Sequence, residues 1–207
     1  MSVREWLIAF QRGELSRDQL RARLRRQPQA DLALSEGQQG MWMLQSVQPD
    51  ASAYNVPICL RLRGPLDPAA LKSACLEVMR VHGLLASAIV ERDGLPRRRP
   101  LAPDTLPFGM HPAEHLSDEQ VIQTMSARLQ TPFVLEHGPL MRADLYAQGA
   151  DRWWLLIVIH HIAFDGGSVD AFMQTLCSCY ERAVDCSMQA GTEAPLGFSE
   201  FVAWERD

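Results

Sequence analysis

The chain has 207 residues, of which 47% are hydrophobic, so it can bury a substantial core as one large domain or two small ones. Its formal net charge of -5 argues against a general nucleic-acid-binding protein, because such proteins gain affinity by neutralising phosphates. The longest apolar run, residues 153–159, is far too short to cross a bilayer, and the first residues lack the apolar core of a signal peptide. We therefore expect a cytoplasmic protein that binds neither nucleic acid nor membrane.

Residues 1–30 are predicted to form a separate helical linker or docking segment, and residues 31–207 the main domain. Two serines in this segment are each followed three residues later by Glu or Gln, the spacing of a capping box that opens a helix. These pairs are Ser2–Glu5 and Ser16–Gln19. Gly13 ends the first helix. So short a helical pair needs another surface to pack on, either the domain that follows or another protein.

The main domain alternates strands and helices. Residues 56–63 alternate apolar and polar side chains, as a half-buried strand does. Asp67-Pro68 opens a helix with its apolar residues on one face. These residues are Leu71, Ala74, Cys75, Val78, Met79 and His82. A strand at about residues 84–91 follows, and Asp93-Gly94 is a strong signal for a hairpin turn.

The second half continues this mixed α/β order. Ser117 with Gln120 predicts a helix that runs to about Gln130. Strands are predicted at residues 140–146 and 152–159, and the second is apolar from 153 to 159, as expected of a strand covered on both faces. Ser168 is then predicted to cap a helix with an apolar face. That face contains Val169, Phe172, Met173, Leu176, Tyr180 and Val184. A last helical piece contains Phe198, Phe201 and Trp204.

Cysteine and arginine usage adds two expectations. The five cysteines are odd in number and lie mostly in periodic segments, so we interpret them as reduced, buried thiols. Cys177 and Cys179 are two residues apart on a predicted helix, where their side chains diverge, which disfavours a shared metal. We interpret the short basic run at residues 97–99 as a solvated face rather than a docking surface for an acidic partner.

The stretch IVIHHIAFDGG, residues 157–167, places His160 and His161 at the end of the apolar strand. Either both histidines simply finish the strand and satisfy backbone groups, or one of them works in catalysis. A metal site is disfavoured because neighbours in a strand point to opposite faces, and no Cys or His at ligand-like spacing completes a shell. The same geometry favours one imidazole that packs inward and another that faces a cavity, where it takes a proton from an amine or hydroxyl.

The residues after the histidines suit a loop beside a substrate. Asp165 either braces this loop by pairing with an arginine elsewhere or is a simple loop or cap carboxylate. Gly166 and Gly167 allow backbone angles and a close approach of substrate that a Cβ would obstruct.

HHIAFDG, residues 160–166, resembles the HHxxxDG signature of the condensation domains of nonribosomal peptide synthetases, which share a superfamily with chloramphenicol acetyltransferase. Three other stretches resemble family motifs in the same order. They are LSEGQQGMW (34–42), PLMRADL (139–145) and FSEFVAWE (198–205). The resemblance runs from about residue 32 to the end. It implies an α/β fold, an α+β two-layer sandwich in which helices flank a mixed sheet.

The resemblance also implies roles for single residues. His161 would be the catalytic histidine, acting as general base toward the acceptor's nucleophile or as its positioner, with His160 beside it. Asp165 would be structural, and Gly166 would lie next to the reacting thioester. We expect Arg142 to pair with Asp165 because neighbouring strands carry them.

The motif residues near the start, Gln38 and Trp42, are expected to shape the fold rather than the chemistry. Residues 79–89 depart from the family's R-H-E-x-L-R-T stretch. Val81, Gly83 and Ala86 stand where Arg, Glu and Arg are usual, and Ser87 stands in the threonine place. Losing two arginines removes charges that an ion-pair network would use.

The family's condensation domain has two similar lobes, and the resemblance covers the first. The complete domain would join a carrier-bound acyl or peptidyl thioester to a carrier-bound amine, in a peptide synthetase or a hybrid with a polyketide synthase. Both substrates would travel on phosphopantetheine arms, with no bound cofactor, metal or nucleotide. Its partners would be carrier protein domains, with a second lobe or a neighbouring module. Without a second lobe to enclose the site, we expect the 207-residue chain to be inactive or nearly so.

Two alternatives stay open. One is a CoA-dependent O-acyltransferase of the same superfamily, and the other is a non-catalytic interaction module that keeps the fold. The motif alone does not separate them.

Overall fold

The computed structural model describes residues 9–16, 19, 32–185 and 202 of the chain. Helices and strands alternate along the main domain, with three short 3-10 turns between them. The strands are β1 (Leu32–Ala33), β2 (Asn55–Arg63), β3 (Ser87–Arg92), β4 (Leu95–Pro100), β5 (Phe108–Pro112), β6 (Met141–Ala147) and β7 (Arg152–His160). The helices are α3 (Glu36–Val47), α4 (Pro68–Val81), α5 (Asp118–Leu129) and α6 (Val169–Val184). The 3-10 turns are η1 (Pro103–Thr105), η2 (His161–Ala163) and η3 (Gly166–Ser168).

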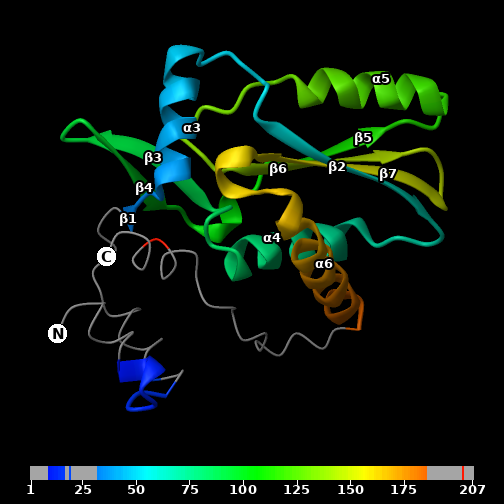
Figure 1. The fold of residues 1–207 in the computed structure, drawn as a ribbon. Helices are drawn as coiled ribbons and strands as arrows, with labels where there is room; N and C mark the ends of the chain where they lie inside the picture. The colour runs from blue at the N-terminus through cyan, green and yellow to red at the C-terminus, as the bar shows by residue number, and fades with distance from the viewer. Residues whose placement is uncertain (1–8, 17–18, 20–31, 186–201, 203–207) are drawn as a thin grey trace.

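Two sheets organise these elements. The larger sheet has the order β2-β7-β6-β5, with β5 parallel to β6 and the other pairs antiparallel. The smaller sheet has the order β1-β4-β3 and is antiparallel. Figure 1 shows α5 along one face of the larger sheet and α4 with α6 along the other. The mixed sheet with flanking helices that the sequence predicts is therefore confirmed, and the helices lie on both of its faces.

Strand β7 is the centre of the core. Its odd-numbered residues Leu155, Ile157 and Ile159 join one cluster with α4 and α6, while Leu156 and Val158 join the other with α5. A strand covered on both faces gains burial from every side chain, which is why the run 153–159 lacks polar residues. This prediction is confirmed, and it means that β7 holds its last residue on a rigid support.

Local signals in the sequence fix several element ends. Asp67 accepts hydrogen bonds from the backbone N–H groups of Ala69 and Ala70, and it caps α4 as predicted. Ser117 and Gln120 form the predicted reciprocal capping box at α5. Asp93 and Gly94 both have positive φ, 53° and 75°, which a two-residue turn between β3 and β4 requires.

Other expectations are wrong or untested. Cys75 and Cys179 are buried, but Cys59 and Cys177 are exposed because they lie on the solvent sides of β2 and α6. Val184, in the last turn of α6, is also exposed. Most of residues 1–30, Cys186 and the helical piece with Phe198, Phe201 and Trp204 lie outside the described residues.

The described part of the N-terminal segment agrees with its predicted caps. Residues 9–11 are helical, Gly13 has a φ of +73°, and Ser16 and Gln19 exchange hydrogen bonds as a capping box does. Among the helices of the described residues, none has the length and apolar character needed to cross a membrane. Helix α3 and strand β5 are elements that the sequence patterns do not predict.

Candidate active site

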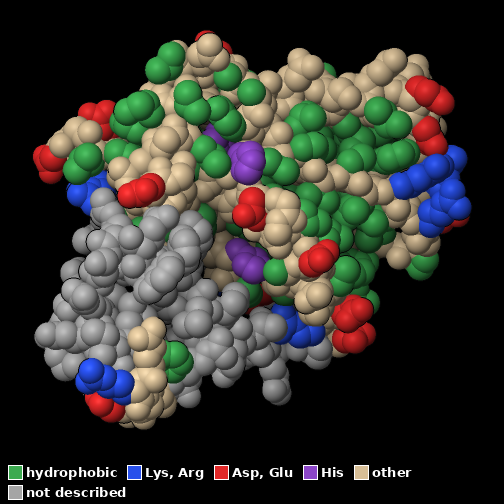
Figure 2. All heavy atoms as spheres, viewed as in Figure 1, with side chains coloured by type: hydrophobic (Ala, Val, Ile, Leu, Met, Phe, Trp, Pro, Cys, Tyr) green, Lys and Arg blue, Asp and Glu red, His purple; other side chains and the backbone are tan. Residues whose placement is uncertain are grey.

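The end of β7 places the two histidines in different surroundings. His160 is the last residue of the strand, opposite Asn55 of β2, and His161 is the first residue of the η2 turn. His160 is 1% exposed, whereas His161 is half-buried. Figure 2 shows histidine side chains reaching the surface near the middle of the viewed face. The structure therefore shows the predicted contrast between an inward and an outward imidazole, with the chain leaving the strand between the two residues.

His160 is suited to hold the turn in place. Its Nδ1 accepts a hydrogen bond from the N–H of Ile162 at 3.1 Å, and its ring lies edge-on to Phe133, with 5.8 Å between the centroids. Burial, and then the charge of His161, lowers the pKa of His160 to about 4. The ring is therefore neutral near pH 7, with its proton on Nε2, and it does not serve as an accessible proton acceptor.

His161 keeps a side chain that a substrate can reach. Its backbone N–H donates to the carbonyl of Tyr54 at 2.8 Å, which ties the turn to the end of β2. The ring's Nδ1 is buried and has no hydrogen-bond partner within the described part of the chain. Because the side chain is only half-buried, Nε2 is the atom that can meet a reacting group. An imidazole so placed can accept a proton from a nucleophile.

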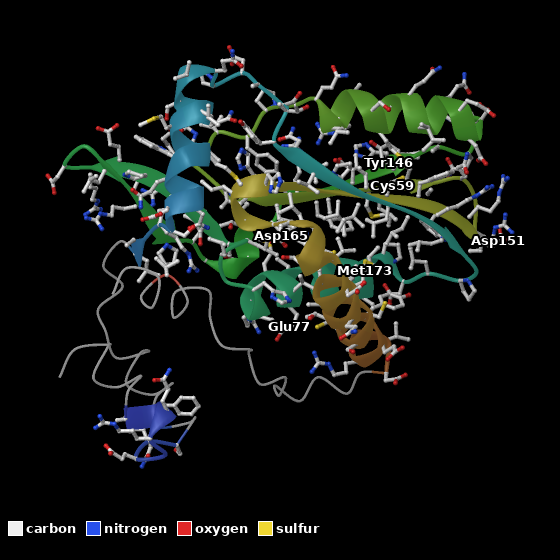
Figure 3. All side chains as sticks on the ribbon, viewed as in Figure 1. Cys59, Glu77, Tyr146, Asp151, Asp165 and Met173 are labelled. Atoms are coloured by element: carbon white, nitrogen blue, oxygen red, sulfur yellow. The ribbon has the colours of Figure 1, made fainter. Side chains whose placement is uncertain are left out.

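Asp165 organises the loop that follows. Its Oδ1 accepts hydrogen bonds from the backbone N–H and the hydroxyl of Ser168, at 2.9 and 2.6 Å. The side chain is exposed, and Figure 3 shows it in the loop between β7 and α6. Ser168 occupies the N-cap position of α6 as predicted, but its side chain makes no cap hydrogen bond. Its hydroxyl donates to Asp165 instead. The position of Ser168 at the start of α6 is as predicted, but the prediction that its side chain accepts a capping hydrogen bond is wrong.

The predicted pair between Asp165 and Arg142 is wrong. Arg142 donates from Nη2 to the carbonyls of Thr131 and Arg128, at 2.6 and 3.2 Å, and its guanidinium carbon lies 4.2 Å from the ring centre of Phe133. The parity of β6 turns Arg142 toward the face that α5 covers. Asp165 follows the end of β7 and precedes α6, which packs on the opposite face.

The two glycines of the motif do not need unusual backbone angles. Neither Gly166 nor Gly167 is among the described glycines with positive φ, so the expectation about backbone angles is wrong. A Cβ added at Gly166 would meet no atom of the described residues within 4 Å. The described residues therefore leave open space at this position, and the predicted closeness of Gly166 to a thioester remains a prediction.

A half-buried arginine of β4, Arg98, contacts the stretch that has unusual residues at positions 81, 83 and 86. Ser87 is fully buried, accepts a hydrogen bond from Nε of Arg98 at 2.8 Å and donates one to the carbonyl of Gly83 at 2.9 Å. Burial lowers the pKa of Arg98 to about 10. Arg98 is thus half-buried and hydrogen-bonded, whereas Arg99 is exposed, so the interpretation of residues 97–99 as a solvated face is wrong for Arg98.

Backbone groups that support His161 escape prediction from the sequence. Tyr54 acts through its carbonyl, so no side-chain pattern marks it. Gln38 donates from Nε2 to the carbonyl of Ile162 at 2.8 Å, a contact that spans 124 positions of the chain. The S-x-x-Q spacing of Ser35 and Gln38 is a usable signal for the start of α3, because these residues form a capping box there.

Within the described ranges, no group of three or more His, Cys, Asp and Glu side chains could hold a metal ion.

Comparison with known proteins agrees with this geometry. The family model described as "Condensation domain" matches residues 28–207. Polyketide synthase PksN of Bacillus subtilis (strain 168) is 34% identical over 172 residues, which cover 83% of this chain and 3% of that protein. The dimodular nonribosomal peptide synthase of the same organism is 27% identical over 178 residues, or 85% of this chain and 7% of that protein.

Solved structures show the same relationship. The first condensation domain of the calcium-dependent antibiotic synthetase, in complex with a substrate analogue, has a TM-score of 0.75 at 25% identity. The match covers 86% of this chain and 43% of that one. The X-domain in complex with OxyB from teicoplanin biosynthesis has a TM-score of 0.76 at 25% identity, covering 85% of this chain and 38% of that one. The chain thus spans less than half of these structures and a few per cent of the curated relatives. The family resemblance drawn from HHIAFDG is confirmed, and the chain belongs to the condensation domain family.

Proposed function

We propose that this chain is the histidine-bearing N-terminal lobe of a condensation domain that forms amide bonds on carrier proteins. The observation that carries this proposal is the contrast at the end of β7, where His160 is buried and neutral while the side chain of His161 is accessible. A proton acceptor on a rigid strand end fits a reaction in which a nucleophile loses a proton.

The reaction is acyl transfer from a thioester to an amine. The amine nitrogen on the acceptor arm attacks the thioester carbonyl of the donor, so a C–N bond forms and the C–S bond breaks. The donor's phosphopantetheine thiolate leaves and is protonated to the thiol. The nitrogen loses one proton, and His161 takes it or holds the amine for the attack. His160 and Asp165 support the backbone around that step.

A complete site needs more surface than the described residues provide. The chain covers 43% of the solved condensation domain it matches, and a Cβ placed at Gly166 would meet no atom of the described residues within 4 Å. Acyl transfer between two carrier arms requires both reactants to be held in a site that excludes water. The proposal therefore includes a second lobe or a neighbouring module, together with carrier domains, as partners.

The proposed domain boundary lies near residue 30. The family match begins at residue 28, which supports residues 1–30 as a linker or docking segment outside the condensation fold. The free thiols of the four described cysteines fit a reducing compartment, which supports the proposed cytoplasmic location.

A carrier-loading assay tests the proposed substrates. The complete domain is mixed with an acyl-loaded donor carrier and an aminoacyl-loaded acceptor carrier, and the acceptor's mass is followed. We expect the acceptor to gain the acyl group through an amide. The matched reaction supplies the same acyl group as soluble acyl-CoA with an alcohol acceptor. Ester formation in that reaction, with no transfer between carriers, would contradict the proposal in favour of the CoA-dependent alternative.

A second candidate function is a binding module without catalysis. The structural match to an X-domain that forms a complex with OxyB favours it. So does the presence of Val81, Gly83 and Ala86 where the family resemblance implies charged residues. In the carrier assay this alternative predicts no transfer in either reaction, together with stable association with another protein of the assembly line.

A further inference from the structure

We propose that Gln38 is a positioning residue for His161, an inference that rests on the proposed catalytic role of that histidine. Gln38 lies near the start of α3, far from the histidines in sequence. Its side chain is buried and reaches the turn that carries His161. The backbone of the turn sets the direction of the Cα–Cβ bond of His161, so contacts that hold this backbone help to place the imidazole.

Hydrogen bonds hold backbone groups at His161 and at the residue after it. The N–H of His161 donates to the carbonyl of Tyr54 at 2.8 Å. The N–H of Ile162 donates to Nδ1 of His160 at 3.1 Å, and the carbonyl of Ile162 accepts from Nε2 of Gln38 at 2.8 Å. A 3-10 turn of three residues has little internal hydrogen bonding to hold itself. These outside contacts therefore define the turn, and Gln38 supplies the one that comes from another helix.

The amide of Gln38 is itself held at both of its polar atoms. While Nε2 donates to Ile162, Oε1 accepts from the N–H of Ser35 at 3.1 Å, within the capping box of α3. Ser35 and Gln38 are each 6% exposed. The amide thus connects the N-terminus of α3 to the turn with a donor on one side and an acceptor on the other. A carboxylate in its place would keep the acceptor and lose the donor.

The chain contains a matched control for this arrangement. Helix α5 begins with the same capping box, in which the N–H of Ser117 donates to Oε1 of Gln120 at 2.8 Å and the N–H of Gln120 donates to the hydroxyl of Ser117 at 3.3 Å. Gln120 is exposed and lies on a different helix from the one that meets η2. A change of the Gln120 side chain therefore removes the same half of a capping box, the hydrogen bond from the serine N–H, without touching the His161 turn.

The test measures the position of the imidazole directly, with the 207-residue chain. NMR records the ring signals of His161 and the hydrogen exchange of the Ile162 amide in the wild type and in Gln38→Ala, Gln38→Glu and Gln120→Ala. We expect exchange at the Ile162 amide to accelerate on the order of tenfold in both Gln38 variants, because the turn opens more readily once the Ile162 carbonyl loses its buried hydrogen bond from Gln38. We also expect the His161 ring signals to shift in those variants, while the Val158 amide and the Gln120→Ala chain stay at wild-type values.

The outcomes separate the inference from the proposed function. Unchanged His161 signals and unchanged Ile162 exchange in Gln38→Glu would overturn the positioning role, whatever the activity. If Gln38→Ala does not fold, Gln38→Glu still decides, because it keeps the capping acceptor. In the complete domain, the positioning role predicts a lower kcat with an unchanged KM for Gln38→Glu. A wild-type domain that transfers nothing would instead refute the proposed function. The NMR result would then still show whether Gln38 positions the His161 ring.

Discussion

The depressed pKa of His160 predicts a specific loss of stability in acid. The ring is buried against Phe133 and Tyr54, and its pKa falls from 6.5 to about 4. The unfolded chain therefore binds a proton at this residue at pH values where the native chain does not. The stabilisation is fully present above about pH 6.5 and is lost as the pH falls toward about 4.

The size of the effect follows from the two pKa values. From linkage, the free energy of unfolding loses roughly 2 kcal/mol from this residue by about pH 5, and roughly 3 kcal/mol by about pH 4. His160→Asn removes the titration and keeps an oxygen near the position of Nδ1, where it can accept from the N–H of Ile162. The variant is less stable at about pH 7 because it loses the ring's packing, but its stability falls less steeply in acid.

Urea unfolding at a series of pH values measures this difference. The quantity of interest is the unfolding free energy of the wild type minus that of His160→Asn, because the titration of other groups cancels in it. His115→Asn, at an exposed histidine, serves as the control and should track the wild type. A difference between wild type and His160→Asn that stays constant from about pH 7 to about pH 4.5 would refute the assignment of a buried, neutral His160.

Two further predictions concern the core that supports the site. Asp144 is 1% exposed and accepts hydrogen bonds from His111 at 2.7 Å and from Arg128 at 3.2 Å, but both partners are partly exposed to solvent. Asp144→Ala should therefore cost about 1–3 kcal/mol of unfolding free energy, while the exposed Asp151→Ala should cost about 0.5 kcal/mol or less. Equal midpoints for the two variants in thermal unfolding would contradict this. Ile157→Ala, at a fully buried position of β7, should cost about 2–5 kcal/mol, against about 0.5 kcal/mol or less for Ile122→Ala, which is 46% exposed in the native chain. Urea midpoints that do not separate these two variants would show that β7 is not the rigid support described.

Much of the fold could be predicted from the sequence because its signals are local. The Asp93-Gly94 turn, the caps at Asp67 and Ser117, and the apolar run of β7 each depend on neighbours within a few positions. Strand β5 escapes prediction because FGMHP is short and contains Gly and Pro, and its pairing with β6 is decided by tertiary contacts. Helix α3 escapes because its SEGQQ start is interpreted as part of a family motif and not as a capping box.

The sequence predicts which side chains belong to the site, but it does not predict which groups they contact. Strand parity is enough to separate His160 from His161. It does not reveal which sheet face Arg142 occupies relative to the loop after β7, so the predicted pair with Asp165 is wrong. The contacts of Tyr54 and Gln38 with the histidine turn join distant segments through backbone groups, and a single sequence contains no pattern for such contacts.

The central claim is that His161 takes part in the transfer step, and one rate tests it most directly. The measurement is the single-turnover rate of amide formation between loaded carriers by the complete domain. We expect His161→Ala to lower this rate by about 10²–10⁴-fold, the usual contribution of a general base, while His115→Ala leaves it unchanged. A His161→Ala domain that forms amide at the wild-type rate would contradict the account.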